Sequence, residues 1–402
     1  MKRTDFSVDW LFAACAPDTE LLPWNAQFTP VDLPHDWQIR HADDLYRDGT
    51  LFYRKYFFVT DVPGTRRMLW FGGAYMDTTV FVNGTEVGQW KYGYTSFWFD
   101  ITDALHEGQN EVLVRCNLRH PNSRWYSGAG LYRNVELWEA PDLHLMPDGL
   151  YVAAKEGDNG AWTVDVTAEA GSVTAASAGR TLTLHLTDDN GSLLGTAAIP
   201  ADAWAALPSP DGWRTGKETT IYKASHTFTL QDPALWDLDA PNFYHITAEL
   251  TGADGVTDTL TTRFGCRTIE ATPDCGLLVN HKRVLIKGVC IHHDFGCLGS
   301  AFEYSAAKRQ LEILKSMGVN SIRTGHTPPA PQFMDLADEM GILMDVESFD
   351  CWRSGKNPYD YGRFFDEWQE KDVAAWIRRD RNHPSLLFWC IAVSYTHLTL
   401  PT

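Results

Sequence analysis

Charged and imidazole side chains follow three apolar segments in the last third of the chain, each at the point where the segment ends. The first segment is followed by residues 292–294 (His-His-Asp), the second by Arg323 and His326, and the third by Glu347 and Asp350. A guanidinium group binds a carboxylate through paired hydrogen bonds, and imidazole and carboxylate groups bind hydroxyl groups. These residue types predict a binding site for a small polar ligand such as a sugar.

A structural role is the alternative for each of these residues. Residues 292–294 have the types found in metal sites, but side chains that are adjacent in sequence point in different directions. We therefore expect structural hydrogen bonding or sugar contact there instead of a metal. Arg323 could brace the edge of a sheet through a salt bridge, and His326 could pack against Pro328 and Pro329.

Strands and helices alternate in the region that carries these residues. Strands are predicted at residues 283–289, 319–323, 342–344 and 385–391, and helices at residues 305–318, 330–341 and 365–380. This alternation forces parallel strands, and continuously apolar strands indicate that both faces of the sheet are covered. The candidates are a doubly wound sheet and a (β/α)8 barrel, in which functional groups gather at the carboxyl ends of the strands. No glycine-rich phosphate loop follows the first strand, which weakens the nucleotide-binding version of the doubly wound sheet.

The ends and faces of the helices follow from single residues. Ser305 is the predicted N-cap of the first helix. Gly318 and Gly341 are predicted to end the first and second helices in the left-handed conformation. Asp338 and Glu339 are predicted to lie on the exposed side of the second helix, away from its apolar face.

Short strands separated by turns make up the earlier part of the chain. Residues 52–137 predict an antiparallel sandwich, with a strong hairpin signal at Asn83-Gly84 between two alternating segments. Residues 143–269 have the size and strand pattern of an immunoglobulin-like sandwich. Asp36 and Trp37 are predicted to form a structural turn.

Composition limits the class of protein. The 402 residues are 44% hydrophobic and 13% aromatic, which is typical of a folded soluble protein of two or three domains. The formal net charge of −18 argues against nucleic acid and anionic membranes as partners. No secretion signal is apparent, and no segment approaches the roughly 18 apolar residues that span a bilayer. The eight cysteines form no C-x-x-C pair, so we expect reduced thiols and a cytoplasmic protein.

Several motifs follow one another along nearly the whole chain up to Ile391. They are LPHDW, YRKYF and RWYSGAGLYRNVEL, then RFGCRTIE, and then LIKGVCIHHDFGCLGS, NSIRTGHTPPAPQFMDLADEMGIL, SFDCWRSGKNPYDY and RRDRNHPSLLFW. In this order they resemble glycoside hydrolase family 2, the family of β-galactosidases and β-glucuronidases. The resemblance implies a multidomain protein with a jelly-roll β-sandwich at residues 1–141, an immunoglobulin-like β-sandwich at residues 142–272, and the first half of a (β/α)8 TIM barrel at residues 273–391.

The resemblance implies a retaining exo-glycosidase that hydrolyses terminal β-D-galactosides, because the segment SFDCWRSGKNPYDY is similar to the β-galactosidase-like branch. A β-glucuronidase-type member is the alternative within the family. A non-catalytic carbohydrate-binding protein, whose β domains hold a sugar without hydrolysis, is the alternative from another class. Retaining glycosidases need two carboxyl groups about 5 Å apart. In this family both belong to Glu residues, which follow the fourth and seventh barrel strands.

The resemblance also implies roles for individual residues. His326 is expected to contact the non-reducing sugar, and Arg323 is expected to orient the nucleophilic carboxylate. Asp350 is expected to line the pocket, with Arg124 and Trp125 reaching in from the first domain.

Two further residues complete the expected substrate-binding set, namely His292 and Glu347. Where the family has Asp-Glu after the third strand, this chain has Asp345-Val346-Glu347. We expect Glu347 to take the position of the family Glu.

The residues after Ile391 depart from the family pattern. Where the family continues with Gly-Asn-Glu, in which the Glu is the proton donor, this chain has Ala392, Val393 and Ser394. The tail VSYTHLTLPT resembles translated adapter sequence, so we expect residues 392–402 not to be native. Both catalytic Glu residues would then be absent, and we expect no glycosidase activity from these residues.

The resemblance implies no cofactor. A divalent or sodium ion is compatible with the family, but no residues of this chain indicate a site for one. The expected partner is a small-molecule carbohydrate substrate, with no nucleic acid and no membrane, and the full-length parent is expected to be a homo-oligomer.

Overall fold

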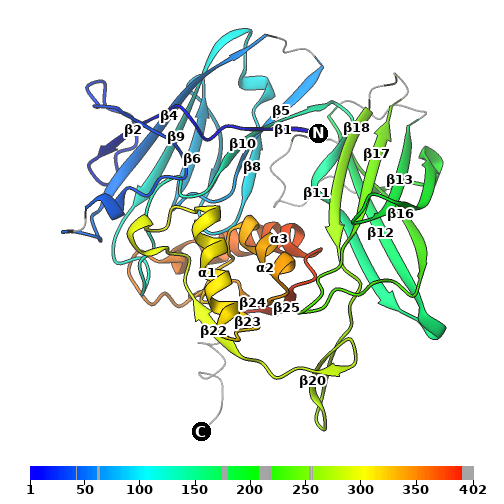
Figure 1. Ribbon diagram of the computed structural model, residues 1–402. Helices are drawn as coiled ribbons and strands as arrows, with labels where there is room; N and C mark the ends of the chain where they lie inside the picture. Colours follow the sequence, from blue (N-terminus) through cyan, green and yellow to red (C-terminus); the bar gives the residue numbers. More distant parts are fainter. Residues whose placement is uncertain are drawn as a thin grey trace.

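The computed structural model describes residues 1–41, 43–60, 64–173, 180–207, 217, 220–252, 255 and 257–391. In Figure 1 these residues form three parts. Two β-sandwiches, blue to cyan and green, lie side by side, and the yellow to red part with the helices lies below both. The predicted non-native tail, residues 392–402, lies outside the described residues.

The first part is the predicted jelly-roll sandwich. Its two antiparallel sheets have the strand orders β3-β2-β4-β9-β6-β7 and β1-β10-β5-β8. The strands are β1 (Lys2–Asp5), β2 (Trp10–Cys15), β3 (Thr29–Val31), β4 (Gly49–Val59), β5 (Thr65–Phe71), β6 (Thr78–Val82), β7 (Thr85–Trp90), β8 (Phe97–Asp100), β9 (Gly108–Leu118) and β10 (Val135–Pro141). Side chains such as Trp10, Phe71 and Val114 fill the core. Asn83 and Gly84 join β6 to β7 with φ of 50° and 80°, the positive values that the predicted hairpin turn requires.

The second part is the predicted immunoglobulin-like sandwich. One sheet has the order β11-β12-β16-β15, and the other has the order β14-β13-β17-β18. The strands are β11 (His144–Glu156), β12 (Ala161–Ser172), β13 (Thr181–Asp188), β14 (Leu193–Pro200), β15 (Ala205–Leu207), β16 (Thr220–Gln231), β17 (Tyr244–Thr251) and β18 (Thr257–Phe264). Alternate residues of facing strands, including Trp162, Leu184 and Ile246, form one apolar core.

The third part begins with a small antiparallel sheet and continues as half of a barrel. The small sheet contains β19 (Ile269–Thr272), β20 (Gly276–Val279) and β21 (Lys282–Arg283). Four parallel strands follow in spatial order, namely β22 (Gly288–Ile291), β23 (Ser321–Thr324), β24 (Leu343–Glu347) and β25 (Leu386–Cys390). The helices between them are α1 (Tyr304–Ser316), α2 (Pro331–Met340) and α3 (Phe365–Asp380). Short 3-10 helices occur at Gln38–Arg40, Thr102–Ala104, Asp158–Gly160, Ala201–Ala203, Gly296–Leu298 and Tyr361–Arg363.

The ends of the helices agree with the sequence analysis except at one point. Gly318 and Gly341 have φ of 88° and 63°, as predicted for residues that end helices. The N-cap of α1 is Glu303 and not Ser305, which lies inside the first turn. The first parallel strand was predicted at residues 283–289, but it begins at Gly288.

The two faces of the parallel sheet differ in burial. Ile322, Met344 and Val346 are fully buried against the helices. On β25, by contrast, the side chain of Phe388 is 50% exposed. The prediction that both faces are covered therefore fails at the edge strand β25, although Leu343 and Glu347 of β24 are fully buried on the face opposite to α1, α2 and α3.

Two sequence-based expectations concern membrane-spanning helices and the cysteines. Among the described residues, no helix has the length and the apolar character needed to cross a lipid bilayer. All eight cysteines lie within the described residues and are free thiols.

The prediction that Asp338 is solvated is wrong. Its side chain is buried, and its carboxylate accepts hydrogen bonds from the backbone N–H of Ser385 (3.0 Å), from His383 Nδ1 (2.6 Å) and from Arg263 Nη2 (3.3 Å). Arg263 belongs to β18, so one carboxylate joins α2 to the second sandwich and to the chain just before β25. Helix α2 is therefore packed on two sides. The apolar periodicity of its sequence indicated only one of these sides.

This cluster makes stability depend on pH. Burial alone would lower the pKa of His383, but the Asp338 carboxylate outweighs burial and raises the pKa from 6.5 to about 9. A pKa that is higher in the folded state stabilises the fold fully below pH 6.5, and this stabilisation is lost as the pH rises through 9. We expect the free energy of unfolding to fall by about 3 kcal/mol across this window through His383.

Urea unfolding at several pH values tests this expectation. The variant Asp338→Asn should be less stable than the wild type at pH 6 and should lose most of the pH dependence between 6.5 and 9. Asp189→Asn, which alters an exposed pair with His245, is the matched control and should change stability by less than about 1 kcal/mol. An unchanged pH slope in Asp338→Asn would refute this account.

Candidate functional site

The carboxyl ends of the parallel strands bring the predicted site residues to one edge of the sheet. In the register, Arg323 of β23 lies beside Asp345 of β24, and Glu347 lies beside Cys390 of β25. Side chains alternate between the faces of a strand. Val346 points into the helix-covered core, so Asp345 and Glu347 both point to the opposite face.

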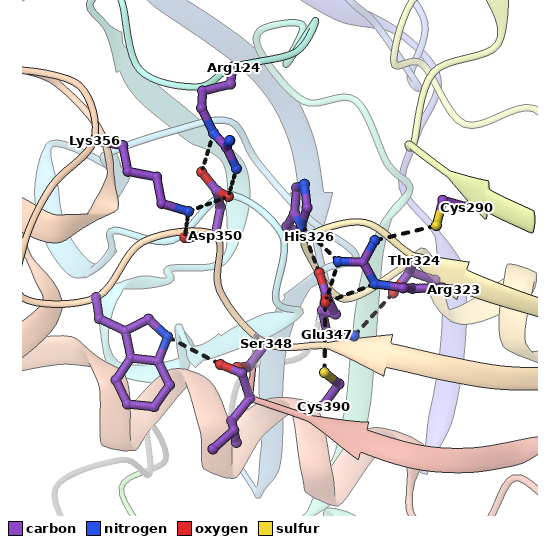
Figure 2. A network of polar contacts seen from close by, with 12 residues as sticks. Arg124, Cys290, Arg323, Thr324, His326, Glu347, Ser348, Asp350, Lys356 and Cys390 are labelled. Atoms are coloured by element: carbon purple, nitrogen blue, oxygen red, sulfur yellow. Dashed lines mark hydrogen bonds and ion pairs between the residues drawn. The ribbon is translucent and has the colours of Figure 1, made fainter. Parts of the chain in front are cut away.

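Glu347 is the centre of the first group of polar contacts (Figure 2). Its side chain is fully buried. Arg323 donates two hydrogen bonds to Oε1, from Nε at 3.0 Å and from Nη2 at 2.6 Å, and His326 Nδ1 lies 2.8 Å from Oε2. Burial alone would raise the pKa of Glu347, but the hydrogen bonds from His326 and Arg323 outweigh it and hold the pKa below 4.5. Glu347 is therefore a carboxylate at neutral pH.

The ionised carboxylate determines the proton on His326. A carboxylate only accepts hydrogen bonds, so Nδ1 of His326 must carry the proton that it shares with Oε2 of Glu347. Nη2 of Arg323 lies 3.2 Å from the same Nδ1. Because both nitrogens are donors, this contact is not a hydrogen bond. This arrangement leaves Nε2 of His326 as the ring nitrogen that can meet a ligand.

Asp345 behaves differently from Glu347, although it lies only two residues away on the same face. Burial, and then the charge of Glu347, raise the pKa of Asp345. Its Oδ1 accepts no hydrogen bond from the described part of the chain. Of the two carboxylates, Glu347 is thus the one that Arg323 and His326 hold in place.

Asp350 is the centre of the second group of contacts (Figure 2). Arg124 approaches it with two nitrogens, Nη2 at 2.5 Å from Oδ1 and Nε at 3.4 Å from Oδ2, and Lys356 Nζ lies 2.9 Å from Oδ1. Burial would raise the pKa of Asp350, but these two cations lower it below its usual value. Arg124 comes from the first sandwich, and its side chain is 47% exposed, so the guanidinium remains accessible.

Trp125 forms an aromatic wall between the two groups. Its ring stacks on His292, with centroids 5.3 Å apart and an interplanar angle of 18°, and lies 5.3 Å from the ring of His326. Its indole N–H donates to the hydroxyl of Tyr94 at 3.3 Å. The first sandwich therefore supplies both a cation and an aromatic face to the edge of the barrel strands.

All of the residues that the sequence analysis proposed for substrate binding lie in this region, namely Arg124, Trp125, His292, Arg323, His326, Glu347 and Asp350. The sequence analysis missed Lys356, although this residue lies in the quoted segment SFDCWRSGKNPYDY. It also missed Cys390, whose Sγ lies 3.7 Å from Oε1 of Glu347. Nothing local marks these residues. Lys356 meets Asp350 only when the loop after β24 folds back, and Cys390 meets Glu347 only when β25 pairs with β24.

In the described part of the chain, His292, His293 and Asp294 do not belong to a group of side chains close enough to share a metal ion. His293 donates from Nε2 to the carbonyl oxygen of Ser127 at 2.9 Å, and burial lowers its pKa to about 4, so it is neutral. Among the described residues, Asp335, Asp338 and His383 lie close enough to share an ion. The pKa of His383 is raised to about 9, so a metal ion would have to displace a proton from this imidazole before it could bind.

The opposite pKa shifts of Glu347 and Asp345 lead to opposite effects of neutral substitutions. Glu347→Gln leaves Arg323 and His326 without their counter-charge, and we expect a loss of about 3 kcal/mol at pH 7. Because the pKa of Glu347 is lowered on folding, this difference from wild type should shrink as the pH falls below 4.5. Asp345→Asn removes a disfavoured charge and should leave stability unchanged or raise it by up to about 1 kcal/mol.

Chemical unfolding monitored by circular dichroism measures both effects. Glu370→Gln, on the exposed side of α3, is the control and should change the free energy of unfolding by less than about 0.5 kcal/mol. Equal losses in Glu347→Gln and Asp345→Asn would contradict the assignment of Glu347 as the held carboxylate.

Comparisons with known families agree along the chain. The profile described as Glycosyl hydrolases family 2, sugar binding domain, matches residues 23–141. The profile described as Glycosyl hydrolases family 2 matches residues 148–267, and that described as Glycosyl hydrolases family 2, TIM barrel domain, matches residues 271–397.

Individual proteins show the same similarity. A β-galactosidase of Bacteroides ovatus is 36% identical over 97% of this chain and 46% of its own length. A β-glucuronidase of Bacteroides fragilis is 27% identical over 91% of this chain and 54% of its own length. The crystal structure of a glycosyl hydrolase family 2 member from Bacteroides cellulosilyticus superimposes with a TM-score of 0.85, at 28% identity, over 97% of this chain and 51% of that one. The chain spans about half the length of these relatives.

Proposed function

The chain belongs to glycoside hydrolase family 2, and we propose that its site binds the terminal sugar of a β-D-galactoside, as the substrate-holding part of a retaining exo-glycosidase. The observation that carries the proposal is the set of two buried, ionised carboxylates, Glu347 and Asp350, beside the aromatic wall of Trp125. The similarity to a protein named β-galactosidase supports the choice of sugar.

The chemistry of a pyranose fits these groups. A sugar ring has apolar C–H faces that pack on an aromatic ring and hydroxyl groups that donate to carboxylates. Trp125 offers the ring, and Asp350 offers carboxylate oxygens whose charge Arg124 and Lys356 balance. Nε2 of His326 adds a further polar atom, because Nδ1 is engaged by Glu347.

Neither of these carboxylates is suited to the bond-breaking steps. A general acid must be protonated, yet hydrogen bonds from cationic partners lower the pKa of both Glu347 and Asp350. A nucleophile must reach the anomeric carbon, but Glu347 is fully buried and its two oxygens are occupied by Arg323 and His326. In our proposal neither Glu347 nor Asp350 is the acid or the nucleophile.

A β-glucuronide is the second candidate for the sugar. The similarity to a protein named β-glucuronidase favours it. Arg124 also presents a half-exposed guanidinium, which could pair with the carboxylate of a uronic acid. In the structure this guanidinium is already paired with Asp350, which favours the neutral galactoside.

A binding measurement separates these candidates. We expect the purified chain to bind methyl β-D-thiogalactoside, which resists hydrolysis, more tightly than phenyl β-D-thioglucuronide, as measured by saturation-transfer NMR titration. Trp125→Ala should weaken galactoside binding about tenfold, since it removes the stacking face. Trp24→Ala is the matched control, because Trp24 is 98% exposed and is predicted to have no effect. Equal weakening in both variants, or preference for the glucuronide, would count against the galactoside proposal.

An activity measurement tests the assignment of roles. We expect the chain, purified from a host that lacks β-galactosidase, to release no nitrophenol from p-nitrophenyl β-D-galactoside, because retaining hydrolysis needs a pair of carboxyl groups and our proposal gives Glu347 and Asp350 other roles. Turnover above the rate of a mock purification would show that carboxylates within this chain suffice, and would overturn the roles proposed for Glu347 and Asp350.

A further inference from the structure

The carboxylate of Asp36 lies at a junction that the sequence analysis treated only as a turn. Asp36 is buried, with 3% of its surface exposed. Its Oδ1 accepts hydrogen bonds from the backbone N–H groups of Gln38 (2.9 Å) and Ala129 (3.0 Å). Its Oδ2 accepts from the Tyr126 hydroxyl (2.6 Å) and from both the N–H (2.8 Å) and the hydroxyl (3.0 Å) of Ser300.

These donors belong to three segments that are distant in sequence. Gln38 follows Asp36 itself, Tyr126 and Ala129 lie in the loop that carries Arg124 and Trp125, and Ser300 lies in the barrel part, between β22 and α1. A turn would need only the contact with Gln38. The same carboxylate instead ties the Trp125 loop to the barrel.

Two glycines show how closely these segments approach. At Gly128, where φ is 65°, a Cβ atom would lie 1.9 Å from the Ser300 hydroxyl and 2.7 Å from Oδ2 of Asp36. At Gly299, where φ is 64°, a Cβ atom would lie 2.3 Å from the same Oδ2. Any side chain at either position would force the segments apart, so the junction has little freedom to move.

Further contacts run from this loop to the residues of the site. The carbonyl oxygen of Ser127 accepts a hydrogen bond from His293 at 2.9 Å, and Trp125 stacks on His292. The loop is thus held to the barrel between Trp125 and Ala129, and Arg124 pairs with Asp350 at its other end. The position of the Trp125 ring over His326 depends on these attachments.

We propose that Asp36 is a positioning residue of the sugar site. Its carboxylate fixes the loop at residues 124–129 against the barrel and so sets the Trp125 ring against His292 and His326. Both oxygens are needed as acceptors, because Asp36 meets only donors. An amide at this position would offer one oxygen and would turn an N–H2 group toward the donors on its other side. The effect on ligand binding rests on the proposed function, whereas the effect on Trp125 does not.

The experiment uses the whole chain labelled with 5-fluorotryptophan, with the Trp125 resonance in the 19F NMR spectrum assigned through Trp125→Phe. We expect Asp36→Asn to shift or broaden the Trp125 resonance and to weaken binding of methyl β-D-thiogalactoside about tenfold. Tyr126→Phe removes one donor from the loop side only and should give a smaller change of the same kind. This milder variant keeps the test open if Asp36→Asn does not fold.

Asp100→Asn is the matched control. Asp100 is also buried in the first sandwich, and its carboxylate accepts hydrogen bonds from Thr102 N–H at 2.9 Å and from Arg66 Nε at 3.0 Å. Its loss should lower stability without moving the Trp125 resonance. The inference is overturned if the resonance and the affinity stay unchanged in both Asp36→Asn and Tyr126→Phe, or if Asp100→Asn moves the resonance as much.

The two proposals can fail separately in this design. If the wild-type chain binds neither thiogalactoside nor thioglucuronide, the proposed function fails, and the 19F spectra still decide whether Asp36 positions Trp125. If the wild type binds the thiogalactoside and the Asp36 and Tyr126 variants bind it equally well, with the same Trp125 spectrum, only the positioning role is lost.

Discussion

A carboxylate that is removed from water must keep its cationic partners, and the edge of the barrel strands is organised around one such group. Glu347 is fully buried, and its charge is tolerated because Arg323 and His326 donate to both of its oxygens. These partners come from the end of β23 and the loop after it. The ion pair therefore constrains the register of β23 against β24 and the path of the following loop, and it engages only Nδ1 of His326.

Buried carboxylates with cationic partners also connect the domains. Asp350 holds Arg124 of the first sandwich beside the barrel, and Asp338 holds Arg263 of the second sandwich against α2. Each carboxylate is buried and would be costly to leave unpaired, so separation of the domains is opposed by electrostatics as well as by apolar contact. The site is consequently a property of the assembled domains, because its aromatic wall and one of its cations lie outside the barrel.

These contacts do not supply every step of the hydrolysis that the family carries out. Ionised carboxylates that are held by cationic groups make poor proton donors. In the proposed function the residues of the site therefore recognise and orient a sugar and do not break the bond. The reason lies in the pKa of each carboxyl group. A cationic neighbour that stabilises the carboxylate lowers this pKa, and the group is then not protonated and cannot act as an acid.

Local sequence signals determined the elements of this protein, and contacts between distant residues decided the rest. The Asn83-Gly84 turn, the helix ends at Gly318 and Gly341, and the alternation of strand and helix were all predictable, because each depends on residues a few positions apart. The burial of Asp338, the pairing of Lys356 with Asp350 and the junction at Asp36 were not. Asp338 and Asp36 depend on partners from another domain, and Lys356 reaches Asp350 only when the loop after β24 folds back on itself. No periodicity along the chain indicates either kind of contact.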